Sequence, residues 1–219
     1  LQFDKVFTEG IGKVTAQDVK YAEDLGFRIK HLGIARRTDA GIELRVHPTL
    51  IPDDQLIANV NGVKNAVLVQ ANAVGPTLYY GAGAGAGPTA SAVVADVVDI
   101  VRDIIYTEDG AGTIPQLAFE ALSDLPILSR EQMTTGYYIR INAEDQMGVL
   151  ADVTTILSRA GISIDAIMQQ PRLSKDLIPI VILTDPIVES KMDAALSQIQ
   201  ALPVIHGEIV RIRLESLDN

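Results

Sequence analysis

A glycine-rich segment carries the strongest chemical signal in the sequence. From Gly81 to Gly87 glycine alternates with alanine, between a β-rich run and a helical pattern. At the start of a helix the first backbone N–H groups have no intrahelical acceptor and the dipole is positive, so an anion can bind there. Glycine also lets a ligand approach the backbone closely. The segment is therefore a candidate anion-binding or cofactor-binding loop, and the alternative is a tight turn packed against its neighbours.

This segment also matches the G-x-G-x-x-A pattern of dinucleotide-binding folds, starting at Gly81. Its surroundings do not fit that fold, because the strand before it belongs to a hairpin. In addition, no β-run that ends in an acidic residue follows the helix. We therefore reject a Rossmann interpretation of the segment.

The loop from Asp145 to Leu150 is a second candidate site. Gly148 lies where a helix is expected to begin, and Asp145 could hold an ammonium group. A free amino acid could then bind with its carboxylate on the helix N–H groups and its amine on the acid. The alternative is an ordinary capped loop between a strand and a helix. Asp165, on the strand after that helix, is either a further polar ligand or a residue that faces solvent.

The other polar residues form no recognisable catalytic or metal site. The three histidines, His31, His47 and His206, lack the spacing of metal ligands, and the sequence has no cysteine. Without cysteine there are no disulfides, thiolate metal sites or cysteine nucleophile. Glu9 is isolated and is expected only to order a loop. We predict no metal and no complete active site.

Composition and charge narrow the class of protein. The 219 residues are 47% hydrophobic and carry a net charge of −10. This length allows one large domain or two small ones with proper cores. The negative charge disfavours nucleic acid or an anionic membrane as a partner, because phosphate binding needs a basic surface. No apolar run reaches the roughly 18 residues of a membrane helix, and the start is not a signal peptide, so the cytoplasm is expected.

The first half of the sequence predicts an antiparallel sheet with helices against it. Its β-rich runs are separated by short glycine-containing turns rather than by the helices of βαβ units. Pro48 and Pro52 are expected to break the chain after the second run. The expected elements are a helix from Thr15 to Gly26, strands over 28–38 and 42–47 around Asp39-Ala40-Gly41, a strand over 63–74 that Gly75-Pro76 turns back into 77–80, and a helix over 89–105.

The last third predicts a βαββαβ unit of the ferredoxin-like type. Alternating apolar residues from Tyr137 indicate a half-buried strand, and Asp185 is expected to cap the second helix with Pro186 at its first position. The expected elements are strands over 137–142, 162–169, 178–184 and 204–214, with Gly207 at a bulge or bend, and helices over 149–160 and from 185. Residues 111–136, with a short helix over 115–122, are expected to connect this unit to the first domain, residues 1–110.

Several blocks of the sequence resemble a known family. They are Thr8–Ile11, Ile29–Ala35, Val46–Leu50, Val60–Val67 and Tyr80–Val93. Together and in this order they resemble the substrate domain of homoserine dehydrogenase. Residues 137–219 resemble the ACT domain that many bacterial members carry at the C-terminus. The resemblance implies an α+β protein, in which an antiparallel or mixed sheet with helices on it precedes a ferredoxin-like ACT domain.

The resemblance implies an NAD(P)-dependent oxidoreductase that interconverts L-aspartate 4-semialdehyde and L-homoserine, on the route to threonine, methionine and isoleucine. In the family the Rossmann domain, the carboxylates that hold homoserine and the catalytic lysine precede this region. We therefore expect that the sequence, which opens on Leu1 as if a chain were under way, begins after them and is inactive alone. Of the family's catalytic and cofactor-binding residues, only Gly85, with Gly83 beside it, has a counterpart in this sequence. The resemblance makes it the contact to NADP or NAD.

The same resemblance makes Asp145, Gly148, Val149 and Leu150 the effector site, with threonine as the implied ligand and a homodimer or homotetramer as the assembly. Two other hypotheses stay open. One is a stand-alone amino-acid sensor in which the glycine loop is structural. The other is a phosphate-binding enzyme of unrelated chemistry, which would need acid–base residues around the glycine loop, and the sequence shows none there.

Overall fold

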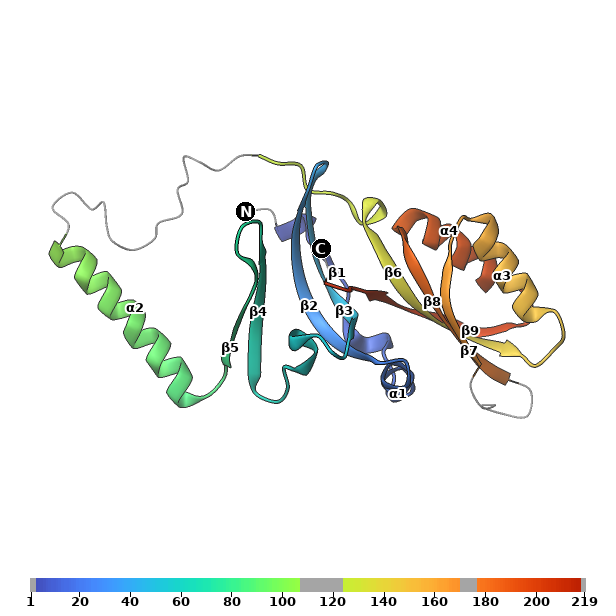
Figure 1. The fold of residues 1–219 in the computed structure, drawn as a ribbon, viewed down its shortest axis with the longest axis horizontal. Helices are drawn as coiled ribbons and strands as arrows, with labels where there is room; N and C mark the ends of the chain where they lie inside the picture. Colours follow the sequence, from blue (N-terminus) through green and yellow to red (C-terminus); the bar gives the residue numbers. More distant parts are fainter. Residues whose placement is uncertain (1–2, 107–123, 170–176, 218–219) are drawn as a thin grey trace. The chain divides into compact units, whose positions relative to one another are not determined.

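A computed structural model describes residues 3–106, 124–169 and 177–217 (Figure 1). The contacts group the chain into two compact units, one made of residues 1–58 with 125–219 and the other of residues 59–124. We describe each unit by itself. The short helix expected over 115–122 lies outside the described residues.

Among the described residues, the N-terminal part of the first unit contains one α-helix and three strands, besides short 3-10 helices. Its elements are β1 (Phe7–Thr8), α1 (Ala16–Asp24), β2 (Phe27–Thr38) and β3 (Gly41–Pro52). Thr15 caps α1 as expected, since its side chain accepts a hydrogen bond from the N–H of Asp18 while the Asp18 carboxylate accepts one from the N–H of Thr15. β2 and β3 form the expected antiparallel hairpin around Asp39-Ala40.

Pro48 does not break the second strand, contrary to the expectation, because β3 continues to Pro52. β3 pairs with β2 along one edge, and along its other edge it pairs first with β1 and then with β9 (Ile205–Leu214). On that second edge the carbonyls of Val46 and Leu50 accept hydrogen bonds, so the nitrogen of Pro48, midway between them, faces the same way. On this edge neither β1 nor β9 pairs with Pro48, so the N–H that proline lacks is not needed there.

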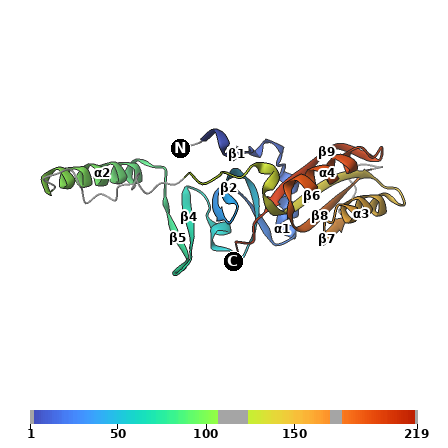
Figure 2. The same cartoon turned by 90° about the horizontal axis from the view of Figure 1, so that it is seen from above.

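The C-terminal part of the first unit has the expected βαββαβ order. Its elements are β6 (Thr134–Glu144), α3 (Val149–Arg159), β7 (Ile164–Gln169), β8 (Leu177–Val188), α4 (Glu189–Gln200) and β9. The strands lie in the order β9-β6-β8-β7, and α3 and α4 cover one face of them (Figure 1 and Figure 2). Gly207 has a positive φ of 71°, and the β6–β9 register shifts there, as expected for a bulge.

One sheet runs through both parts of the first unit. Its order is β1-β3-β9-β6-β8-β7, with β2 on β3. The join is a short parallel pairing of β3 with β9, in which Thr49 lies opposite Arg213 and Leu50 opposite Leu214. The βαββαβ unit is therefore an extension of the sheet that residues 7–52 begin, rather than a detached module.

The strand expected from Tyr137 is confirmed, but its expected half-burial is wrong, because β6 is buried on both faces. On one face Tyr137, Ile139 and Ile141 pack against α3 and α4. On the other face Tyr138 packs with residues of α1, and Arg140 forms an ion pair with Asp18 of that helix. The alternation of apolar and polar residues does not mark an exposed face here, because each face meets a helix. The structure also places residues 134–136, the end of the expected connection, in this strand.

The expected helix start at Asp185 and Pro186 is also wrong. β8 continues through both residues to Val188, and α4 begins at Glu189. The beginning of β6 pairs with residues 187–188 and holds them extended, and the register shift in this pairing falls at Asp185 and Pro186. Proline is tolerated at such bulges because no ladder hydrogen bond is required of it.

The second unit is a hairpin followed by a helix. β4 (Lys64–Ala71) and β5 (Gly75–Ala82) pair antiparallel, and α2 spans Ala86–Tyr106. The chain turns at residues 72–74, so Gly75 and Pro76 open β5 instead of forming the turn. The hairpin confirms that the glycine-rich segment does not follow a strand of a parallel βαβ unit.

Candidate functional sites

The glycine-rich loop joins β5 directly to α2 and is exposed throughout. Gly85 has a φ of 130°, in a region that side-chain-bearing residues rarely adopt, and its carbonyl accepts the N–H of Thr89. A Cβ added at Gly81 or Gly87 would meet no atom within 4 Å. The backbone here is therefore open to a ligand, and the first amides of α2 lie beside Gly85.

Gly83 has a different reason to be glycine. A Cβ at this position would lie 2.0 Å from the side-chain nitrogen of Asn65, on the neighbouring strand β4. The packed-turn explanation therefore fits Gly83. Gly85 is exposed and needs glycine for its φ of 130°, and a Cβ there would also lie 3.3 Å from Cδ of Pro88. Contact of this loop with an anion or a cofactor stays a prediction.

The loop between β6 and α3 places a bare helix start at the surface. Gly148 is the N-cap residue of α3, has a φ of 94° and makes no side-chain cap. The residues from Asp145 to Gly148 are all exposed. Since the first amides of a helix have no intrahelical acceptor, those of Val149 and Leu150 point toward this open end.

Val149 and Leu150 contribute to this site through their backbone. The side chain of Val149 is buried in the core between the sheet and the two helices, and that of Leu150 packs against the same core. They fix the first turn of α3 so that its amides face outward. Asp165, on β7, is exposed.

A hydrogen-bonded pair that the sequence did not reveal borders the loop from Asp145 to Leu150. Glu144, the last residue of β6, lies 2.8 Å from Nε2 of His206, and its backbone N–H donates to the carbonyl of Val204. The side chain of Gln146 donates to the same carboxylate. These contacts fix the beginning of the loop to β9.

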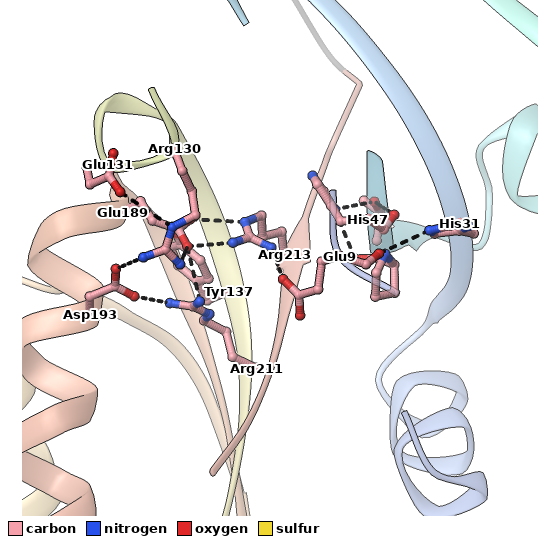
Figure 3. A network of polar contacts seen from close by, with 12 residues as sticks. Glu9, His31, His47, Arg130, Glu131, Tyr137, Glu189, Asp193, Arg211 and Arg213 are labelled. Atoms are coloured by element: carbon pink, nitrogen blue, oxygen red, sulfur yellow. Dashed lines mark hydrogen bonds and ion pairs between the residues drawn. The ribbon is translucent and has the colours of Figure 1, made fainter. Parts of the chain in front are cut away.

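A buried network of charges surrounds Glu189, the first residue of α4 (Figure 3). Its carboxylate is fully buried and accepts hydrogen bonds from Arg213, Arg130 and the hydroxyl of Tyr137. Burial alone would raise the pKa of Glu189, but the hydrogen bonds and charge of Arg213 hold it below its usual value. Glu189 is therefore an anion inside the protein.

The same network reaches residues far away in the sequence. Arg211 and Arg130 both pair with Asp193 on the next turn of α4, and Arg213 donates to Glu9 at 2.8 Å. Three arginines thus face the buried carboxylate of Glu189 and the more exposed ones of Glu9, Asp193 and Glu131. Glu9 was expected only to order a loop. It is the residue of this network that belongs to the N-terminal part of the unit.

A second buried ion pair lies on the opposite face of β6. Arg140 donates to both oxygens of Asp18, at 2.6 and 3.2 Å, and the hydroxyl of Tyr138 donates to the same carboxylate. Burial would raise the pKa of Asp18, but the hydrogen bonds from Arg140 and Thr15 hold it below its usual value. The pair fastens α1 to the βαββαβ part.

His47 is buried and faces this charge-rich region from β3. Its Nδ1 lies 3.0 Å from the carbonyl of Pro48 and from the hydroxyl of Thr49. Burial, with the nearby charges of Arg213 and Arg45, lowers the pKa of His47 to about 4. The folded protein therefore holds this imidazole neutral at pH 7.

We expect the stability of the chain to fall as the pH drops from 6.5 to 4. In that range the unfolded chain protonates His47 and the folded chain does not, a difference of about 3 kcal/mol over the whole range. Urea unfolding at several pH values measures it, with His47→Gln as the non-titrating variant. A pH slope equal in both proteins would contradict the assignment.

Among the described residues, no three histidine or acidic side chains come together as metal ligands. In the same part of the chain, none of the helices has the length and apolar character required to cross a membrane.

Comparisons with known proteins cover both parts of the chain. The family model for homoserine dehydrogenase matches residues 1–98, and the model for the ACT domain matches residues 137–204. Homoserine dehydrogenase from Pseudomonas aeruginosa is 57% identical over 100% of this chain and 50% of its own length. The enzyme of the same name from Neisseria gonorrhoeae is 48% identical over 99% of this chain and 50% of its own length.

The fold agrees with a solved structure of the same family. The crystal structure of a homoserine dehydrogenase from Thiobacillus denitrificans has a TM-score of 0.89 and 54% identity, covering 99% of this chain and 49% of that one. The chain thus spans about half the length of the relatives it matches. It belongs to the homoserine dehydrogenase family, with a homoserine dehydrogenase segment at residues 1–98 and an ACT domain at residues 137–204.

Proposed function

We propose that this chain is the substrate-domain and effector-domain part of an NAD(P)-dependent homoserine dehydrogenase. The reaction is hydride transfer between the cofactor and the pair L-aspartate 4-semialdehyde and L-homoserine, for threonine, methionine and isoleucine synthesis in the cytoplasm. Support comes from the family match over both parts and from the open glycine loop. Residues 1–110, 111–136 and 137–219 are our proposed substrate portion, connection and regulatory domain.

The glycine loop is the proposed contact to NADP or NAD, which supplies or accepts the hydride when bound. The fit rests on Gly85, whose backbone is exposed next to the first amides of α2. Gly83 lets the loop pass close to Asn65, so its role is to shape the loop beside that contact. The residues that would distinguish NADP from NAD belong, on the family resemblance, to the nucleotide-binding domain.

Residues 1–219 alone are expected not to oxidise NADPH with aspartate semialdehyde. The reason is that the chain spans half the length of its relatives, and the sequence contains no recognisable active site. The absorbance of NADPH at its nicotinamide band, followed over time with the purified chain and aspartate semialdehyde, measures this. Turnover above that of a heat-inactivated sample would contradict the expectation.

We propose that the loop from Asp145 to Leu150 binds an amino-acid effector, and that the effector is threonine. Its carboxylate would accept hydrogen bonds from the amides of Val149 and Leu150, and Asp145 would hold its ammonium group. The single observation that carries this is the uncapped, exposed start of α3 at Gly148. Because the sheet of this part is paired to β3, an effector-controlled enzyme is favoured over a stand-alone sensor.

Replacing Gly148 with valine is expected to abolish threonine binding. In the wild type, threonine at a hundredfold excess over its Kd should stabilise the chain by about 2.7 kcal/mol. The variant loses this shift, because a side chain at a φ of 94° distorts the backbone that meets the carboxylate. Thermal unfolding with and without threonine, and with glycine for comparison, measures the effect.

Gly161→Val is the matched control for this experiment. Gly161 ends the same helix with a φ of 72°, and a Cβ there also meets no atom within 4 Å. Both variants should therefore carry a similar backbone strain of about 2 kcal/mol, while only Gly148→Val loses the threonine shift. If Gly148→Val keeps the full shift, the loop is an ordinary cap.

We further propose that the protein is a homo-oligomer. α2 exposes valine and isoleucine side chains on several sides, and apolar surface of this kind is typical of protein–protein contacts. These residues are Val93, Val94, Val97, Val98, Ile100, Val101, Ile104 and Ile105.

A further inference from the structure

Arg213 holds one carboxylate from each family segment on a single guanidinium group (Figure 3). Its side chain is 1% exposed. Nε donates to Glu189 at 3.0 Å and Nη1 donates to Glu9 at 2.8 Å. Glu189 begins helix α4 of the ACT domain, whereas Glu9 follows strand β1 of the homoserine dehydrogenase segment.

The Glu9 end of this contact is tied to the N-terminal strands. The N–H of Glu9 donates to the carbonyl of Val46 on β3, and its own carbonyl lies 3.2 Å from Nε2 of His31 on β2. The guanidinium of Arg213 also lies over the ring of Phe7, 4.6 Å from its centre. A movement of Arg213 would therefore change the contacts of β1 and of the residues that follow it.

The Glu189 end is tied to the strand that leads to the effector loop. The hydroxyl of Tyr137 donates to Glu189 at 2.7 Å. Tyr137 lies on β6, which ends at Glu144, immediately before the loop. Seven residues of strand, about 23 Å, separate the two points. A strand paired on both sides acts as a stiff connection over this distance.

The two halves of the contact differ in how easily they break. Glu189 is fully buried and takes two hydrogen bonds from Arg213, so separating it would leave a buried charge without its partner. The side chain of Glu9 is 28% exposed and can turn to water. Of the two ion pairs of Arg213, the one with Glu9 is therefore the easier to separate.

We propose that the Glu9–Arg213–Glu189 contact transmits effector occupancy from the ACT domain to β1. Effector binding shifts β6 and α4, draws Arg213 from Glu9, and loosens the segment around residues 7–10. This rests on the proposed binding of threonine at the Asp145–Leu150 loop. Arg213 is a positioning residue here, and Glu9 is the point at which the homoserine dehydrogenase segment receives the signal.

Hydrogen exchange measured by mass spectrometry on the whole chain tests the proposal. In the wild type, threonine should slow exchange at residues 148–151 and speed exchange at residues 7–10 by roughly fivefold to tenfold. In Glu9→Gln, exchange at residues 7–10 should already be fast and threonine should not change it further, while the loop is still protected.

Glu208→Gln is the matched control, because Glu208 of β9 pairs with Lys13 and so joins the same two parts through an exposed ion pair. It should respond to threonine like the wild type. Protection of residues 148–151 without any change at residues 7–10 would overturn the proposal, and so would a wild-type response in Glu9→Gln.

A measurement without ligand tests the transmission through Arg213 independently of which amino acid is the effector. If threonine protects nothing in the wild type, the proposed effector is wrong, and Tyr137→Phe then decides the proposal. Without the hydroxyl that orients Glu189, exchange at residues 7–10 should rise, and it should rise no further when Glu9→Gln is added. Unchanged exchange at residues 7–10 in Tyr137→Phe would refute transmission through this contact.

Discussion

Replacing Glu189 with glutamine is expected to lower the free energy of unfolding by about 4 kcal/mol. The substitution keeps the size of the side chain and removes its charge. Arg213, Arg211 and Arg130 would then lose the one fully buried carboxylate that they share, in a place where Arg213 is 1% exposed. Uncompensated buried charge is among the most destabilising changes that a protein can undergo. Urea-induced unfolding of the whole chain at pH 7 measures the loss.

The same change at an exposed position is the control for Glu189→Gln. In Glu208→Gln the lost partner is Lys13, and the two side chains are 67% and 65% exposed. Water solvates both groups, so the loss should stay below about 1 kcal/mol. Equal losses in the two variants would show that burial of the Glu189 network adds nothing to stability.

Replacing Arg140 with methionine is expected to cost about 3 to 4 kcal/mol at pH 7. Methionine retains much of the apolar volume of the arginine stem but leaves the carboxylate of Asp18 buried without its cation. Thr15 and Tyr138 still donate to it, which limits the loss. The helix α1 should detach more readily, and urea unfolding measures the difference from the wild type.

Acidification distinguishes a lost ion pair from lost packing in Arg140→Met. Without the cation, burial raises the pKa of Asp18, so that lowering the pH protonates and neutralises the buried group. The difference between variant and wild type should therefore shrink as the pH falls from 7 toward 4. Arg28→Met, which breaks an exposed pair with Glu23, should lose less than about 1 kcal/mol. A difference from the wild type that is independent of pH would mean that Arg140 acts through packing alone.

Features with a local cause were predictable from the sequence. Thr15 caps α1 through Asp18, three residues away, and Gly161 and Gly207 adopt positive φ where a helix ends and a strand bulges. These signals depend on neighbouring residues only, so the sequence contains them directly. The order βαββαβ followed from such signals together with apolar periodicity.

Features that depend on distant partners were not predictable. β8 passes through Pro186 because its pairing with β6, far away in the sequence, holds it extended. β3 passes through Pro48 because its pairing with β2 continues to Pro52, while on the other edge Pro48 lies between the residues that pair with β1 and those that pair with β9. Local rules treat proline as a breaker, and they contain no information on which strand lies alongside. The burial of β6 on both faces has the same cause, since α1 is more than a hundred residues away from it.

The candidate sites were found from the sequence where glycine marks the backbone, at Gly85 and Gly148. The Glu189 network was missed, because Glu9 lies 204 positions from Arg213. One signal was available. Arg211 and Arg213 alternate with apolar residues in the last strand, a pattern normally taken as an exposed face. Because that face meets α4, Arg213 is buried and the side chain of Arg211 is only 17% exposed, so both arginines need carboxylate partners.

The central claim is that a free amino acid binds at the start of α3 and is held there by backbone amides. Amide chemical shifts of the ¹⁵N-labelled chain, recorded during titration with L-threonine, test it most directly. We predict saturable changes that are largest at Gly148, Val149 and Leu150. Changes concentrated elsewhere, or none with any proteinogenic amino acid, would contradict the claim.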